Sequence, residues 1–131
     1  MIHRVLIVDD EPDIITSLEF LMRGSDYEVR VALNGGEALQ LAESFRPDVV
    51  LLDVMMPQRS GFEVCQKIRE NPVLRDVKII MLTAKGSNAE RDRGLNFGAN
   101  AYVTKPFSTK ELMSTVRALL TESKAPDTGR R

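Results

Sequence analysis

The fold is decided by an apolar run that ends in two aspartates, VLIVDD at residues 5–10. Two runs of the same kind follow, VVLL at residues 49–52, which leads into Asp53, and VKIIML at residues 77–82. Their apolar residues are nearly continuous rather than alternating, which is typical of strands buried on both faces of a parallel sheet. Weaker runs at residues 27–32 and 101–104 complete a set of five predicted strands.

Between the strands, apolar residues recur at helical spacing. The stripes are Ile14, Leu18, Leu21 and Met22; Ala38, Leu41, Ala42 and Phe45; Phe62, Cys65 and Ile68; and Leu112, Val116, Leu119 and Leu120. A further helix near residues 89–97 contains Gly94 and few apolar residues, so it is predicted to be the most mobile. The alternation predicts an α/β, flavodoxin-like (βα)5 three-layer sandwich with a parallel sheet in the order 2-1-3-4-5.

Helix starts are marked by residue pairs that fit the capping box. The pairs are Ser60 with Glu63, Ser87 with Glu90 and Ser108 with Glu111, with Asn34 and Glu37 as a variant. Pro12 suits the first turn of the first helix, where its missing N–H has no partner to lose. Residues 1–120 are therefore predicted to form one domain. Residues 121–131 have no large apolar residue and are predicted to be a disordered tail or linker stub.

Composition excludes several classes of function. The chain of 131 residues carries a formal charge of −1 and has no basic stripe, so direct nucleic acid binding is not expected. No apolar run approaches the roughly 20 residues needed to span a membrane. The single cysteine, Cys65, excludes an internal disulfide and is consistent with a reducing compartment, so a cytoplasmic location is expected.

Polar residues follow the predicted strands at their carboxyl ends, where open parallel sheets place their active crevice. These residues are Asp9 and Asp10, Asp53, Thr83 and Lys105. Three carboxylates in one pocket repel one another, so Lys105 and a divalent cation are expected to compensate them. All-oxygen ligands favour Mg²⁺, Mn²⁺ or Ca²⁺ over zinc. Such a cation could orient an incoming phosphoryl group for attack by Asp53, with Thr83 and Lys105 binding its oxygens.

Taken together, these motifs resemble the receiver domains of bacterial response regulators. The matching residues are Asp9-Asp10, Leu51-Leu52-Asp53, Pro57 with Gly61, Thr83-Ala84 and Lys105-Pro106-Phe107, and the resemblance extends over residues 4–120. It implies a phosphorylation-dependent signalling switch rather than an enzyme. The phosphoryl group would come from a histidine kinase or phosphotransfer protein. An output domain or partner would be controlled through the surface of the fourth helix, fifth strand and fifth helix.

The resemblance also implies roles for individual residues. Asp53 would be the phosphoacceptor, Asp10 a direct metal ligand and Asp9 a ligand acting partly through water, with the backbone carbonyl of Met55 completing the coordination of Mg²⁺. Lys105 would pair with the phosphoryl group, and the Lys105–Pro106 peptide bond would be cis.

Two residues would form the switch that the resemblance implies. Thr83 would provide the switch hydroxyl, and Tyr102 would be the aromatic residue that swings inward. The helix near residues 89–97 would be the element that moves. A plain core role is the alternative for Tyr102.

Two departures from the family pattern matter. Met55 and Lys85 offer no carboxylate or amide to guide water, so slow self-dephosphorylation is predicted. The chain looks closest to receivers that precede winged-helix domains, which often dimerise using acids just before the tyrosine. Asn100 and Ala101 stand there, so a homodimer would be weakened, although Arg91, Glu111 and Arg117 remain.

Two other functions fit a nucleophilic aspartate or this fold. A phosphohydrolase of the haloacid dehalogenase type carries a second acid two residues after its nucleophile, where this chain has Met55. A flavin carrier needs a phosphate-binding loop after the first strand, and the acids of residues 9–13 would repel phosphate unless a metal were bound.

Overall fold

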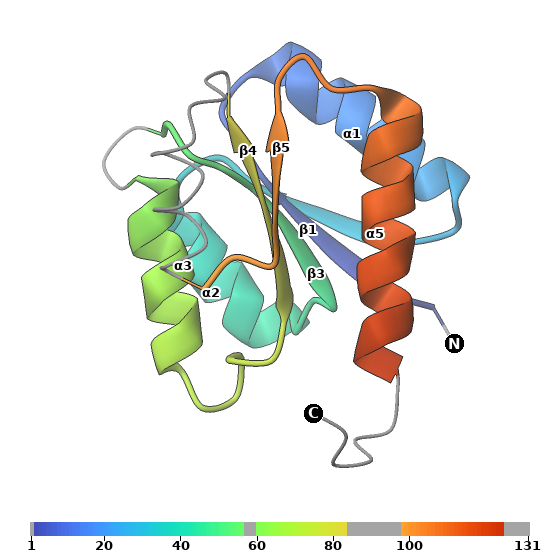
Figure 1. Ribbon diagram of the computed structural model, residues 1–131. Coiled ribbons are helices and arrows are strands. Elements are labelled where there is room, and N and C mark those ends of the chain that lie inside the picture. The colour runs from blue at the N-terminus through green and yellow to red at the C-terminus, as the bar shows by residue number, and fades with distance from the viewer. Residues whose placement is uncertain (1, 57–59, 84–97, 125–131) are drawn as a thin grey trace.

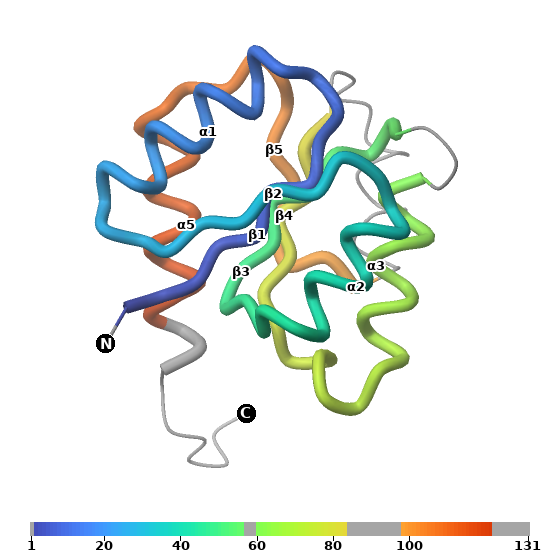
Figure 2. Tube along the Cα trace, turned by 180° about the vertical axis from the view of Figure 1, so that it is seen from behind, coloured from blue at the N-terminus to red at the C-terminus, as the bar shows by residue number. Residues whose placement is uncertain are grey.

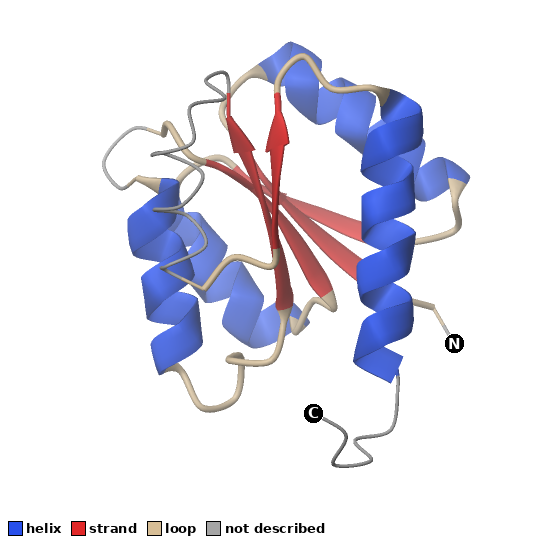
Figure 3. Cartoon of the chain, in the orientation of Figure 1, coloured by secondary structure: helices blue, strands red, loops and turns tan. Residues whose placement is uncertain are grey.

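A computed structural model describes residues 2–56, 60–83 and 98–124. Five parallel strands form one sheet in the order β2-β1-β3-β4-β5, and Figure 3 shows them in one central layer. The strands are β1 (Arg4–Val8), β2 (Glu28–Ala32), β3 (Val49–Asp53), β4 (Lys78–Thr83) and β5 (Ala101–Thr104). The predicted strand order and flavodoxin-like fold are confirmed. The predicted ends are shifted slightly, because Tyr27 and Val77 lie just before their strands whereas Asp53 and Thr83 are the last strand residues.

Helices cover both faces of the sheet. In the part of the chain that the structure describes they are α1 (Pro12–Gly24), α2 (Gly35–Phe45), α3 (Gly61–Glu70) and α5 (Thr109–Lys124). Figure 1 shows α1 and α5 on one face and α2 and α3 on the other, and the reverse view in Figure 2 agrees. The helix predicted near residues 89–97 and the Ser87–Glu90 capping pair lie outside the described residues.

The core explains why the strands are apolar along their whole length. Val5 and Ile7 of β1 belong to the cluster that α1 and α5 cover, whereas Leu6 and Val8 belong to the cluster under α2 and α3. Neighbouring residues of a strand point to opposite faces, so a sheet covered on both sides needs apolar side chains at every position. Cys65 is buried on α3 as predicted, and burial raises the pKa of its thiol to about 11.

The predicted capping residues bind the helix starts. The side-chain oxygens of Asn34, Ser60 and Ser108 accept hydrogen bonds from the backbone N–H groups three residues later, at 2.9, 3.3 and 3.2 Å. These bonds satisfy amides that have no partner within the helix. Pro12 begins α1, as expected.

The predicted domain boundary at residue 120 lies within helix α5. Helix α5 continues through Lys124, so the first residues of the predicted tail are helical, while residues 125–131 lie outside the described part of the chain. A helix makes its own backbone hydrogen bonds, and residues such as Glu and Lys favour it without burial. Among the helices described, none is long and apolar enough to cross a membrane.

Arg69 connects α3 to two other parts of the domain. Its guanidinium donates to the carbonyl oxygens of Gly98, Val77 and Arg75 at 2.9, 2.6 and 2.8 Å. It also donates to Oδ1 of Asn100 at 2.8 Å, and this oxygen accepts a second bond from the backbone N–H of Ile79. The planar, five-donor shape of the guanidinium suits such a set of acceptors. Arg69 therefore fixes the segment that leads into β5.

Substituting Arg69→Met is expected to lower the free energy of unfolding by about 2–4 kcal/mol, because carbonyl oxygens beneath the side chain lose their donors. Urea denaturation would measure this change. Arg69→Lys should restore little of it, since a single ammonium cannot reach these acceptors together. Lys67→Met, at an exposed position of the same helix, is the control and should change stability by less than about 0.5 kcal/mol. Equal midpoints for the Arg69 and Lys67 variants would refute this account.

Candidate functional site

The sheet brings the predicted site residues to one edge. Asp9 directly follows β1, and Asp53 ends the neighbouring strand β3. Thr83 ends β4 and lies one residue beyond the position paired with Asp53, while Lys105 directly follows β5. Asp9, Asp53 and Thr83 are all buried. Because the strands are parallel, their carboxyl ends meet here, and residues far apart in sequence become neighbours.

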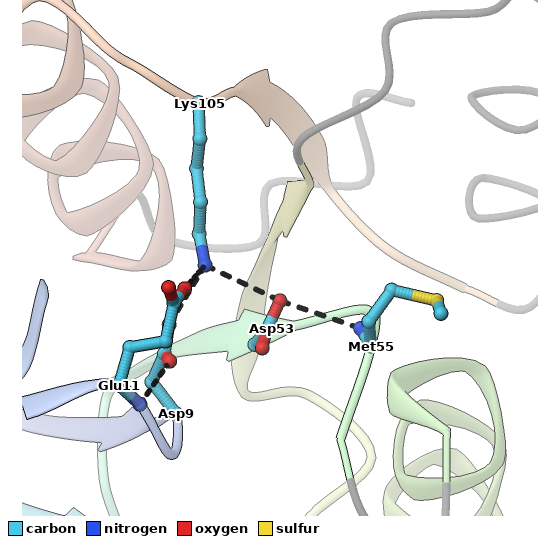
Figure 4. A network of polar contacts seen from close by, with 5 residues as sticks. All are labelled: Asp9, Glu11, Asp53, Met55 and Lys105. Carbon is cyan, nitrogen blue, oxygen red and sulfur yellow. Dashed lines mark hydrogen bonds and ion pairs between the residues drawn. The ribbon is translucent and has the colours of Figure 1, made fainter.

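Lys105 is the centre of a network of ion pairs. Its Nζ lies 3.0 Å from Oδ2 of Asp9, 3.3 Å from Oε1 of Glu11 and 3.4 Å from Oδ1 of Asp53. Figure 4 shows the lysine side chain extending from the end of β5 to the carboxylates beyond β1 and β3. Only 10% of the Lys105 side chain is exposed, so its charge is shielded from water and the attraction is strong. The Lys105–Pro106 peptide bond is cis.

The carboxylates also suit a divalent cation. Asp9, Asp10 and Asp53 each offer an oxygen, and these oxygens lie within 4.8 Å of one another. Hard oxygen donors of this kind match Mg²⁺ and Mn²⁺. Asp9 and Asp53 are buried whereas Asp10 is exposed, so the group is open to water on one side. The donor set therefore fits the predicted metal.

The backbone and side chain of Met55 have different relations to the site. The Met55 N–H donates to Oδ1 of Asp53 at 3.3 Å. Its thioether side chain points away from Asp53 in Figure 4 and is 71% exposed. The backbone of Met55 thus lies beside the carboxylate, as a backbone ligand would require, while the side chain presents no polar group to it.

The charges change the proton affinity of the site. The pKa of Asp53 is raised to about 6, first by burial and then by the negative charge of Asp9; Lys105 and the Met55 N–H lower it less. Burial would lower the pKa of Lys105, but its contacts with Asp9 and Asp53 outweigh burial and raise it. One lysine therefore does not fully offset the carboxylates, and the site favours a further positive charge.

Binding of Mg²⁺ is expected to weaken by roughly tenfold between pH 7 and pH 5, because protons compete for Asp53 once the pH falls through about 6. Calorimetric titration of the protein with MgCl₂ at several pH values would measure this change. In Asp53→Asn the affinity should be lower throughout and nearly independent of pH over this range. A wild-type dissociation constant that stays the same at pH 5 and pH 7 would rule out this role for Asp53.

Comparison with known proteins decides the family. A model of the response regulator receiver domain matches residues 5–117. The chain belongs to the response regulator receiver domain family. Receiver domains are signalling modules of two-component systems, so the fold and the resemblance predicted from the sequence are both confirmed.

Solved receiver domains have closely similar structures. A protein of Chloroflexus aurantiacus J-10-fl, named as a response regulator, is 39% identical with a TM-score of 0.88, over 92% of this chain and 99% of that one. Chemotaxis protein CheY4 of Vibrio cholerae is 33% identical with a TM-score of 0.86, over 91% and 99%. The receiver domain of a Syntrophus aciditrophicus signal transduction histidine kinase is 31% identical with a TM-score of 0.87, over 96% of both chains.

The receiver domain places most of the predicted residues together. Asp9, Asp10, Asp53 and Lys105 form one cluster, and Thr83 is buried at the neighbouring strand end. Tyr102 is half-buried on β5 and packs against the core beneath α2 and α3, a position that leaves both its switch role and its core role open. The contact between Glu11 and Lys105 was not predicted from the sequence. One sequence feature does point to another role for Glu11, because a glutamate stands at a helix start where Ser, Thr, Asp or Asn is preferred.

Proposed function

We propose that this receiver domain is a switch controlled by transfer of a phosphoryl group to Asp53. The observation that carries the proposal is a buried aspartate at the end of β3, in contact with Lys105 and beside Asp9 and Asp10. An oxygen of Asp53 would form a bond to phosphorus while the P–N bond of a phosphohistidine breaks and the imidazole leaves with the electron pair. The donor would be a histidine kinase or a phosphotransfer protein.

The surrounding residues would bind the transferred group. Mg²⁺ or Mn²⁺, held by Asp9, Asp10, Asp53 and the backbone carbonyl of Met55, would offset charge on the phosphoryl oxygens. The ammonium of Lys105 would donate a charge-assisted hydrogen bond to one of these oxygens, and the hydroxyl of Thr83 would donate to another. Met55 presents no side-chain group that could activate water, which supports slow self-dephosphorylation.

The output of the switch would pass through the surface of the fourth helix, β5 and α5, of which the fourth helix lies outside the described residues. Reversing a population from 1:99 to 99:1 requires roughly 5.5 kcal/mol of differential stabilisation. The free energy of new hydrogen bonds from Lys105 and Thr83 to the phosphoryl oxygens, in a buried site, is of the order needed to contribute this stabilisation. Rearrangement of Thr83 and Tyr102 would carry the change to an output domain or partner. The protein would act in the cytoplasm, without direct binding to nucleic acid.

A homodimer through this surface would be weak. Oδ1 of Asn100, which stands where an acid is usual in dimerising receivers, is already bonded to Arg69 and to the backbone of Ile79. Glu111 and Arg117 are exposed on α5, while Arg91 lies outside the described residues.

Intact-mass analysis after incubation with acetyl phosphate would test the proposal. One phosphate should be gained in the presence of Mg²⁺ and none when EDTA replaces it. Failure to gain phosphate under conditions where calorimetry shows bound Mg²⁺ would overturn the proposal, and would indicate a receiver that acts by protein contacts alone.

A further inference from the structure

Helix α1 begins without a side-chain cap. Its N-cap residue, Glu11, has extended backbone angles (φ −93°, ψ 115°), and its side chain binds none of the helix amides. Each of the other helices described has a capping side chain, from Asn34, Ser60 and Ser108. A capping residue typically contributes about 1 kcal/mol of stability. The absence of a side-chain cap at the start of α1, directly after Asp9 and Asp10, indicates that Glu11 has another role.

The side chain of Glu11 reaches across to Lys105 instead. Its Oε1 lies 3.3 Å from Nζ, and Figure 4 shows the contact beside that of Asp9. The backbone N–H of Glu11 donates to Oδ1 of Asp9 at 2.9 Å, which holds the residue at the rim of the site. Among the described residues, the carboxylates that could share a metal are those of Asp9, Asp10 and Asp53, so the role of Glu11 is tied to the lysine.

The donors of Lys105 are fully used in this arrangement. An ammonium group has three N–H donors, and Asp9, Glu11 and Asp53 provide three acceptors. A phosphoryl group on Asp53 therefore obtains more than the one donor that Asp53 already accepts from Lys105 only when the contact with Asp9 or Glu11 is given up.

Asp53 is the residue that reacts, so Asp9 and Glu11 are the carboxylates that compete with it for the ammonium, and their exposed fractions show which of these two contacts costs less to break. The Asp9 side chain is 0% exposed and would lose its donor without gaining water, a costly change for a buried charge. The Glu11 side chain is 61% exposed, so water can replace the lysine there.

We propose that Glu11 is a positioning residue that competes with the phosphoryl group for Lys105 and so limits the rate at which Asp53 is phosphorylated. This inference rests on the proposed function. The glutamate holds the ammonium at the rim in the resting state and releases it as negative charge develops on the phosphoryl oxygens.

Substituting Glu11→Gln should raise the rate of phosphorylation by acetyl phosphate, at saturating Mg²⁺, by roughly two- to fivefold, the range of a partly exposed ion pair. Glu19→Gln is the matched control: it removes the same charge from α1, where Glu19 pairs with Arg23 at 3.5 Å, and should leave the rate unchanged. An unchanged or lower rate for Glu11→Gln would overturn the inference. A wild-type protein that gains no phosphate would instead refute the proposed function.

A second comparison separates competition for Lys105 from simple charge repulsion. In a Lys105→Gln background, with the slower reaction followed at higher acetyl phosphate, Glu11→Gln should change the rate by a factor of about one. The same increase in both backgrounds would show that Glu11 acts through its charge alone and would overturn the inference.

The unphosphorylated protein provides an independent test of the contact. The ¹⁵N resonance of the Lys105 ammonium should shift in Glu11→Gln and stay in place in Glu19→Gln. A resonance that is the same in wild type and Glu11→Gln would also overturn the inference, whatever the residual rate of the Lys105 variant.

Discussion

Asp53→Asn is expected to gain no phosphate and, at pH 7 without Mg²⁺, to be more stable than wild type by about 1–3 kcal/mol. The amide has nearly the shape of the carboxylate but cannot attack phosphorus. The pKa of Asp53 is raised from 3.8 to about 6 on folding. Its contribution to stability is therefore fully present below about pH 4 and is lost as the pH rises through 6. The amide of Asp53→Asn is neutral at every pH, so the variant keeps at pH 7 the stability that wild type loses when Asp53 ionises.

Urea denaturation of both proteins between pH 4 and pH 7 would measure this effect. The advantage of Asp53→Asn should shrink as the pH falls, because the wild-type carboxyl becomes neutral as well. Saturating Mg²⁺ at pH 7 should stabilise wild type more than the variant, because the proposed cation site needs the ionised carboxylate of Asp53. A wild type that is the more stable protein at pH 7 without Mg²⁺ would contradict the assigned pKa shift.

Gly61→Ala is expected to lower stability by about 2–4 kcal/mol and to slow phosphorylation as well. Gly61 begins α3, and its N–H donates to the carbonyl oxygen of Val54 at 2.8 Å. A Cβ at this position would collide with the carbonyl oxygen of Asp53 and would lie 2.9 Å from Cα of Val54. These atoms are backbone, so relief requires α3 to move away from β3 or the end of β3 to shift. Either movement disturbs the residue that carries the reactive carboxylate.

Gly24→Ala is the matched control for this prediction. Gly24 is the last residue of α1, and no atom lies within 4 Å of the position that its Cβ would occupy. Replacement there should be neutral or should stabilise by up to about 1 kcal/mol, by restricting the unfolded chain. Thermal unfolding and acetyl phosphate kinetics of the two variants test the account together. If Gly61→Ala has the melting temperature and rate of Gly24→Ala, the close packing of α3 on β3 does not constrain the site.

The sheet and the main site could be predicted from the sequence because the signals for both are local. Each strand is marked by its own apolar run, and each site residue stands at the end of such a run. A continuous apolar run is compatible with few alternatives to a buried parallel strand, and the order of runs along the chain limits the topology. The carboxyl ends of such strands meet at one edge. The sequence therefore predicts that Asp9, Asp53 and Lys105 are neighbours.

The rest depends on choices between partners that a sequence pattern does not specify. Lys105 could have paired with either aspartate alone, and only the path of its side chain shows that Glu11 shares it. The contact of Asn100 with Arg69 joins residues 31 positions apart through a loop geometry with no sequence signature. The extension of α5 to Lys124 depends on backbone hydrogen bonding rather than on an apolar pattern, so the apolar pattern does not predict it.

The most direct test of the central claim is to map the phosphoryl group after reaction with acetyl phosphate and Mg²⁺. Reduction with borohydride would convert the phosphorylated aspartate to homoserine, and peptide mass spectrometry would locate it. The account predicts a single modified residue, Asp53, with Asp9 and Asp10 unchanged. Modification of Asp9 or Asp10 in place of Asp53, or of no aspartate in a protein that has bound Mg²⁺, would contradict it.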